Sequence, residues 1–332
     1  MRLEKLDRLP NDWDEVIRDF DTKTLFHQKA WMDHVLDIHP KGKFQVFVIL
    51  DGQDVVGYFP TLKIWKGPVP IFGSPLGGTG TNFMGPLVAQ DADQKGVLSA
   101  IDGLLGMRGA LHLEISNPWM DREVMGHLGY RVQKGVTHLV ELPATADEAW
   151  NGMKGTGRNR VRKAEAQGAA AEITDEPELV DHFFAQFQEV YGKQGKAVPF
   201  GIERPRSLWN RLKPAGNLLT VWVRVGDEIA ATGLFPYDER CIYFWGAASW
   251  IKHHPACPNE LLHWTVIKTA VERGIPLYNM CGGQSQFKDK FGGVDVPYPV
   301  YFRSALPGLS AARDYYRQLH FRSLVRRGPQ NA

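Results

Sequence analysis

The sequence predicts a protein of the α/β (α+β) class, in which two similar units follow one another along a chain of 332 residues. Strand-like runs joined by short turns occur once in each half, at residues 44–64 and 218–246. Each run is followed by a helical pattern and then by another apolar strand. The order of elements therefore repeats, which weighs against chance likeness of two hairpins and indicates a tandem repeat.

The first unit opens with residues 44–64, FQVFVILDGQDVVGYFPTLKI. Apolar residues typical of strands flank Asp51-Gly52, a pair that favours a tight hairpin turn. Residues 94–109 are then expected to form a helix and residues 110–116, ALHLEIS, a strand.

The second unit opens with residues 218–246, which are predicted to form a three-stranded meander. Its turns are expected at Gly226-Asp227 and at residues 238–240. The stretch GDEIAA at 226–231 resembles GQDVVG at 52–57, which supports the repeat.

The helix of the second unit is expected over residues 259–274, where Leu262, Val266 and Ala270 recur every four residues and form one apolar face. Asn259 is the expected N-cap, and the glycine and proline at 274 and 276 end the helix. The strand IPLYNM follows at 275–280.

The two units are predicted to join near residues 141–158, where a proline and three glycines interrupt regular structure. We expect a first unit over residues 1–145 and a second over 146–332. Their charges differ: residues 1–150 hold 15 Lys and Arg against 20 Asp and Glu, whereas residues 151–332 hold 24 against 17. The second half is thus basic by +7, which favours an anionic ligand, although half-chain charges of this size are common.

Composition excludes several classes of protein. The N-terminal residues contain no apolar run of the kind found in secretory signals, and no window approaches the roughly 18 apolar residues that span a bilayer. Cys241, Cys257 and Cys281 lack metal-ligand spacing, so no metal site is expected, and a reducing cytoplasm is the simplest setting. The chain is expected to fold alone; a monomer fits, and the oligomeric state is left open.

The stretch GRNRVRKAEAQG, residues 157–168, concentrates positive charge on a short predicted helix. Arg158 and Arg162 lie four residues apart and so share a helix face. Guanidinium groups match phosphate oxygens bidentately, which suggests a phosphate clamp. A solvated helix face is the simpler interpretation of such a run.

A second candidate region is the entry to the 259–274 helix, preceded by the strand end YFWGAAS at 243–249. Unpaired N–H groups at a helix N-terminus can hold a phosphate or a developing oxyanion. Neither GxGxxG nor GxxxxGK[ST] occurs, so Rossmann and P-loop sites are not indicated.

The third region is GGQSQFKDKFGG, residues 282–293, where two glycine pairs bracket Phe287, Lys288 and Phe291. Glycines let the backbone pass close to a ligand. Core packing of Phe291 and a surface position for Lys288 are the alternatives that involve no chemistry.

These three stretches, in this order, resemble the Fem-type aminoacyltransferases of peptidoglycan cross-bridges and their GNAT-like (FemAB-like) acyltransferase relatives. The likeness is most specific at Phe287-Lys288-x-x-Phe291-Gly292 and weaker at Arg158–Gly168. The resemblance implies two tandem GNAT-like units, with mixed sheets flanked by helices and a cleft between the units. Many relatives have Asp in the strand before the glycines, where this chain has Asn279.

The resemblance also implies a site. Lys288 is the implied catalytic residue, since a fixed cation near the reacting carbonyl stabilises the oxyanion of acyl transfer. Phe287 and Gln284 would contact substrate beside it. Substrate binding is further assigned to five residues of the second unit: Arg158, Arg162 and Lys163 for phosphates, and Trp245 and Asn259 for the donor channel.

The resemblance implies a cytoplasmic enzyme with no permanently bound cofactor, which transfers an aminoacyl group from aminoacyl-tRNA to an amine of a cell-wall precursor or peptide-like small molecule. An acyl-CoA donor is the close alternative. A third interpretation is a non-catalytic module that binds RNA or a nucleotide-sugar through the basic half.

Overall fold

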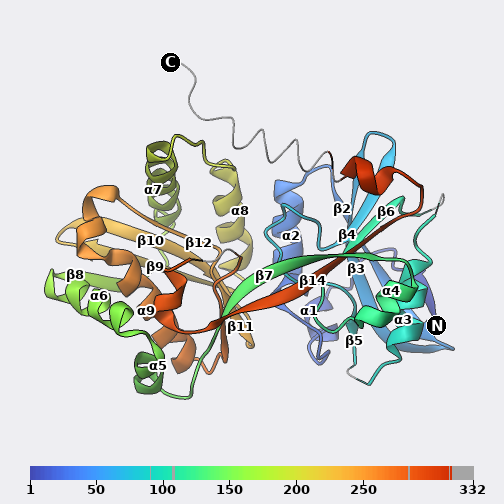
Figure 1. Cartoon of the computed structure of the whole chain (residues 1–332), viewed down its shortest axis with the longest axis horizontal. Helices are drawn as coiled ribbons and strands as arrows, with labels where there is room; N and C mark the ends of the chain where they lie inside the picture. The colour runs from blue at the N-terminus through green and yellow to red at the C-terminus, as the bar shows by residue number, and fades with distance from the viewer. Residues whose placement is uncertain (90, 107–108, 283–284, 314, 316–332) are drawn as a thin grey trace. The chain divides into compact units, whose positions relative to one another are not determined.

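The computed structural model describes residues 1–89, 91–106, 109–282, 285–313 and 315. The chain forms two compact units (Figure 1). Among the described residues, unit 1 is Met1–Gly135 together with residues 297–313 and 315, and unit 2 is Val136–Val296. Two long strands, β7 (Arg131–Glu141) and β14 (Val294–Ser304), each contribute residues to both units.

Unit 1 is built on a mixed sheet with the strand order β1-β2-β3-β4-β6-β14. The remaining strands of this unit are β1 (Arg2–Lys5), β2 (Lys43–Asp51), β3 (Asp54–Lys66), β4 (Val69–Ser74), β6 (His112–Ile115) and the short β5 (Leu87–Val88), which pairs with β3. The β2–β3 hairpin turns at Gly52, whose φ is 60°, as the Asp51-Gly52 pair predicts. Strands β4 and β6 run parallel.

The helices of unit 1 enclose two sets of buried apolar side chains. These elements are α1 (Trp13–Val16), η1 (Leu25–His27), α2 (Lys29–Ile38), α3 (Gln94–Asp102) and α4 (Arg122–His127). One face of the β2–β3 hairpin packs through Phe47 and Phe59 with Leu98 of α3. Val46, on the other face, packs with Trp13 and Met32. The strands thus alternate between two cores, as a period of two requires.

Two ionisable side chains of unit 1, His27 and Glu114, have strongly lowered pKa values. His27 is fully buried, and burial lowers its pKa to about 4 even though its ring hydrogen-bonds to the backbone of Thr24 and Gly85. Burial of Glu114 opposes its ionisation. Contacts with His112 and Arg313 outweigh this effect and lower the pKa of Glu114 to about 2.

Unit 2 contains an antiparallel sheet with the order β12-β10-β9-β8 and a second group in which β13 lies between β11 and β7. The strands are β8 (Ala169–Ile173), β9 (Leu218–Val225), β10 (Glu228–Pro236), β11 (Cys241–Tyr243), β12 (Gly246–Ser249) and β13 (Leu277–Asn279). Of the predicted three-stranded meander, the β9–β10 hairpin is present, but β11 belongs to the other sheet and meets the end of β10 only through an isolated bridge between Tyr237 and Ile242. Strand β11 pairs with β13 and β12 with β10, so the chain changes strand partner at Phe244-Trp245.

The helices of unit 2 cover both faces of its four-stranded sheet. They are α5 (Ala146–Gly152), α6 (Gly155–Ala166), α7 (Leu179–Lys193), α8 (Glu203–Leu212), η2 (Ile251–Ala256), α9 (Pro258–Glu272) and η3 (Lys288–Phe291). A Cβ on Gly233 would lie 3.1 Å from Leu262 of α9, and one on Gly246 would lie 2.9 Å from Phe183 of α7. Gly246 pairs with Leu234, the neighbour of Gly233, so α9 and α7 cover opposite faces.

Helix α9 starts earlier than the sequence suggests. Asn259 was the expected N-cap, and this expectation is wrong: Cys257 is the N-cap and Pro258 occupies the first turn. Proline fits there because its φ suits the helix and the N–H that it lacks has no helical partner at that position. Cys257 itself has a φ of 55°.

The α/β fold class predicted from the sequence is confirmed. Within the part of the chain that the structure describes, no helix is both long and apolar enough to cross a membrane.

Candidate active site

The glycine-rich segment after β13 brings Lys288 back onto the strand end. Lys288 is only 8% exposed, at the start of η3. Its Nζ donates to the carbonyl oxygens of Cys281, at 3.1 Å, and Gly282, at 2.7 Å. Cys281 has a φ of 59°, so the chain reverses sharply there. Lys288 therefore fixes the turn and holds its charge at the end of β13.

Burial lowers the pKa of Lys288, although the nearby Cys281 and Asp295 oppose this shift. Behind it, burial and then the charge of Lys288 lower the pKa of His263 to about 3. His263 Nδ1 lies 2.6 Å from the Tyr278 hydroxyl. The imidazole is therefore neutral at ordinary pH.

An aromatic layer surrounds this histidine. The ring of Phe287 lies 5.2 Å from that of His263 and 5.4 Å from that of Phe291. Phe291 is 2% exposed and belongs to the core, as the core-packing interpretation of this residue expected. Phe287 is only partly buried. Lys290 Nζ lies 5.0 Å from the centroid of the Phe287 ring.

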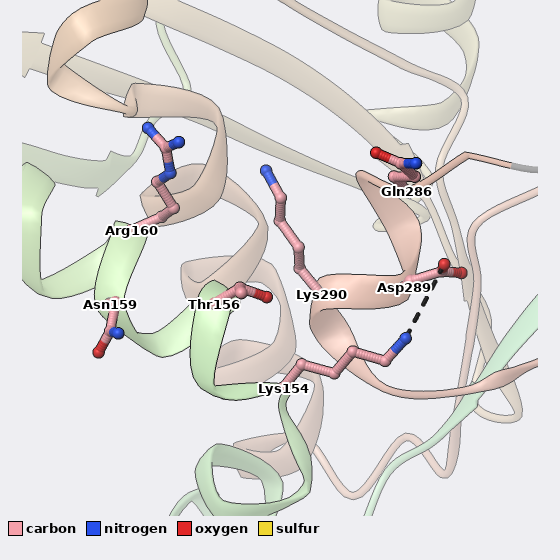
Figure 2. A pocket seen from close by; sticks show the side chains of 7 residues that line it. All are labelled: Lys154, Thr156, Asn159, Arg160, Gln286, Asp289 and Lys290. Atoms are coloured by element: carbon pink, nitrogen blue, oxygen red, sulfur yellow. Dashed lines mark ion pairs between the residues drawn. The ribbon is translucent and has the colours of Figure 1, made fainter.

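A cavity of about 550 Å³ lies between the N-terminal end of α6 and η3 (Figure 2). Seven residues line it: Lys154, Thr156, Asn159, Arg160, Gln286, Asp289 and Lys290. Apart from one carboxylate, the lining is cationic or neutral and polar. Phosphate groups are the ligands that such a lining favours.

The cations of the cavity are held by neighbours at its rim. Lys154 Nζ lies 3.8 Å from Asp289 Oδ2, the ion pair dashed in Figure 2. Lys290 Nζ lies 2.6 Å from Glu260 Oε1. Arg160 donates to Cys257 Sγ at 3.3 Å. Because Cys257 and Glu260 belong to the start of α9, two of the lining cations are tied to that helix N-terminus.

The α6 residues that the sequence singled out lie elsewhere. Arg158 Nη1 donates to the carbonyl oxygens of Asn151, at 3.0 Å, and Met153, so it caps α5. The Arg162 guanidinium lies 5.3 Å from the centroid of the Trp150 ring. Lys163 is exposed in the last turn of α6. None of these three belongs to the residues that line the cavity.

Trp245 lies where the chain changes strand partner, and Asn259 contacts the end of β12. Trp245 packs against Phe183 and Phe200, with centroids 5.9 and 5.8 Å away. Asn259 Nδ2 donates to Ser249 Oγ at 2.8 Å, while its Oδ1 is buried without a hydrogen-bond partner. Gln284 lies outside the described residues.

Sequence reasoning missed Lys154, Arg160 and Lys290, although a signal for them existed. Gly157, Val161 and Ala164 are the buried residues of α6 and recur at helical spacing. Thr156 and Arg160 flank this stripe on one side and Arg158 and Arg162 on the other. The sequence does not say which flank faces η3.

No group of three His, Cys, Asp or Glu side chains among the described residues is arranged to hold a metal ion.

Comparison with known proteins shows which proteins this chain resembles. Residues 152–289 match the acetyltransferase (GNAT) domain family. The sequence matches no curated protein. The fold is similar to that of FemX, with a TM-score of 0.70, 13% identity and coverage of 89% of this chain and 96% of FemX.

Two further solved structures share the fold. A tandem GNAT protein from the clavulanic acid biosynthesis pathway has a TM-score of 0.53 and 11% identity over 92% of this chain and 99% of its own. The C-terminal domain of a putative lysylphosphatidylglycerol synthetase from Agrobacterium fabrum has a TM-score of 0.53 and 13% identity over 90% and 94%. The predicted resemblance to Fem-type and GNAT-like proteins is confirmed in the fold: residues 152–289 carry a GNAT-type domain, and the chain is an enzyme of the acyltransferase class.

Proposed function

We propose that this protein transfers an aminoacyl group from aminoacyl-tRNA to an amine of a cell-wall precursor or a peptide-like small molecule, in the cytoplasm and as a monomer. The observation that carries the proposal is the position of Lys288. Its buried ammonium lies in the same segment that supplies Gln286, Asp289 and Lys290 to the cationic cavity. A charge for the reacting carbonyl and a site for donor phosphates thus occur on one stretch of chain.

In the proposed reaction the acceptor nitrogen attacks the ester carbonyl carbon of the donor. The carbonyl oxygen becomes an oxyanion beside the Lys288 ammonium, whose bonds to Cys281 and Gly282 already fix its position. Charge held in advance needs no reorganisation when the oxyanion forms. The intermediate then expels the ribose oxygen of the tRNA, which takes up the proton that the amine loses.

His263 is not the base for this proton. A pKa of about 3 leaves the imidazole neutral, but its Nδ1 is engaged with the Tyr278 hydroxyl in the buried aromatic layer. We therefore assign proton transfer to groups of the substrates themselves, which the enzyme holds in position.

The first test compares turnover by wild type, Lys288→Met and Lys288→Arg. Loss of the cation should lower the rate by about 10²–10³, the usual effect of removing one oxyanion donor, with donor affinity nearly unchanged. Arginine should restore part of the rate. A Lys288→Met enzyme with the wild-type rate excludes this role.

The second test assigns the donor. Wild type, Lys154→Gln and Arg160→Gln should be compared for binding of charged tRNA at several salt concentrations, with Arg162→Gln as the matched control on the other flank of α6. Each lost phosphate contact should reduce the salt slope by about 0.7 to 0.9. Equal binding of charged and uncharged tRNA, together with binding that survives Lys288→Ala and no turnover, would indicate the non-catalytic RNA module instead.

An acyl-CoA donor is the second candidate, and one observation favours it. Asn259 Oδ1 is a buried acceptor without a partner at the first turn of α9. The amide N–H groups of a pantetheine arm are donors that would satisfy it, whereas phosphate oxygens are acceptors and would not. Saturable acetyl-CoA binding that weakens in Asn259→Ala would select this donor over tRNA.

A further inference from the structure

The tip of the β3–β4 hairpin in unit 1 presents an exposed aromatic ring. Trp65 is 57% exposed, and the residues that follow it to Pro68 are exposed as well. Strand β3 ends at Lys66, and Gly67, with a φ of 58°, turns the chain into β4. The tip is therefore a convex projection that carries a ring usually found at least half-buried.

Four lysines occur in this hairpin or on the strand that pairs with it and the residues just before that strand. Lys43 of β2 pairs in register with Lys63 of β3, and Lys41 precedes them while Lys66 follows the ring. Like charges directly opposite in a sheet destabilise it. Such a pair is consistent with a surface that meets an anionic partner.

Few acidic residues lie near these lysines along the chain. Residues 39–44 and 61–71 contain no Asp or Glu, and Asp37 of α2 is the acidic residue nearest along the chain. Lys63 Nζ lies 4.8 Å from the centroid of the Trp65 ring and 5.5 Å from that of Phe72. The cation and the ring thus occupy one face of the hairpin.

We propose that this hairpin tip docks the protein on the surface of an anionic lipid bilayer. Tryptophan prefers the headgroup region, because its ring is apolar and its N–H is polar. Each lysine near an anionic leaflet strengthens binding about fivefold. Pro68 and Val69 beside the ring add apolar surface at the level that would enter the interface. The proposal concerns where the enzyme works and is independent of its donor.

A single-stranded nucleic acid is the partner that these residue types would otherwise suit. Stacking of a base needs an open ring face. Here the Lys63 ammonium occupies one face of Trp65, and the projecting tip offers no groove to follow a backbone. A bilayer fits both features, since it accepts a convex tip and its phosphates engage the lysines.

The test is co-sedimentation of the full chain with vesicles of phosphatidylcholine alone and with a quarter phosphatidylglycerol, at 0.1 and 0.5 M salt. Wild type should bind the anionic vesicles only and lose binding at high salt. Trp65→Ala should weaken binding at least tenfold, and Lys63→Gln with Lys66→Gln about 25-fold.

Two matched controls accompany these variants. Val55→Ala removes a side chain that is 54% exposed at the opposite end of β3, and Lys95→Gln with Lys134→Gln removes two exposed lysines of unit 1 elsewhere. Both should bind like wild type, and thermal melts should show that all variants fold. Wild type that ignores anionic vesicles, or controls that lose as much binding as the tip variants, overturns the proposal. Loss of oligouridine binding by Trp65→Ala, with no vesicle binding by wild type, overturns it in favour of RNA.

Discussion

The substitution Gly157→Ala tests whether the cationic cavity depends on a close approach of α6 to η3. A Cβ at Gly157 would lie 2.5 Å from the Lys290 carbonyl oxygen, whereas ordinary contacts begin near 3.4 Å. The same oxygen accepts a hydrogen bond from the Lys154 N–H at 3.0 Å. The backbone of η3 must therefore move by most of an ångström, and this hydrogen bond is strained with it.

The cost follows from two opposing effects. Overpacking of this kind destabilises by about 1–3 kcal/mol. Alanine in a helix gains up to about 1 kcal/mol over glycine. Gly155 is the matched control, because it lies in the same turn and a Cβ there would meet nothing within 4 Å. Gly155→Ala should show the gain alone, so the two variants should differ by about 1–3 kcal/mol.

Urea unfolding followed by tryptophan fluorescence measures this difference. Gly157→Ala should also weaken donor binding, since Lys154 and Lys290 line the cavity on its two sides. If Gly157→Ala is as stable as Gly155→Ala, the close approach of the two segments is wrong.

Three further predictions concern ionisable groups. Burial lowers the pKa of Lys288 below the ordinary 10.5, so activity that needs its positive charge should be lost as the pH rises, at a pH below that value. In Lys288→Arg the same loss should occur at a higher pH. Identical alkaline pH–rate profiles of wild type and Lys288→Arg contradict a charged catalytic role for Lys288. His27 and His263 have folded-state pKa values of about 4 and about 3, below the ordinary value of 6.5. The free energy of unfolding should therefore be highest above pH 6.5 and should fall by about 1.4 kcal/mol per pH unit for each histidine as the pH drops toward 4. Equal urea midpoints at pH 6.5 and pH 4.5 would rule this out. Arg313→Ala leaves Glu114 buried without its cation and should cost on the order of 3 kcal/mol at pH 7; a variant with the wild-type urea midpoint shows that the pair contributes nothing.

Much of the fold could be predicted from local patterns. The Asp51-Gly52 turn, the β9–β10 hairpin and helix α9 follow from period-two and period-four spacing, which depends on near neighbours. The third strand of the expected meander did not follow, because β11 pairs with β13 in the other sheet. Strand β14 has no such signal, because its partner β6 lies far away in the sequence. The start of α9 depended on the backbone of Cys257, which sequence alone does not specify.

Within the candidate site, the glycine-bracketed segment indicated Lys288 and Phe287. The structure places the Lys288 ammonium at the residues that follow β13 and the Phe287 ring against His263, and the roles of both residues stay predictions. Side-chain direction on α6 was the part that failed to follow from the sequence, since Arg158 turns back to cap α5 while Arg160 faces the cavity. A charge run shows that cations are present, but tertiary packing selects the ones that meet a ligand.

The late position of strand β14 in the sequence affects how unit 1 folds during synthesis on the ribosome. Its residues Tyr301–Ser304 pair with β6, and Ser304 contacts His112, which was synthesised 192 residues earlier. At about 5–20 residues per second, a ribosome needs roughly 10–40 s to cover that interval. Throughout it, the β6 edge of unit 1 is exposed and can pair with other nascent chains. The amino-terminal half is thus translated first and completed last, so its yield in the cell should depend on chaperones that shield an open sheet edge.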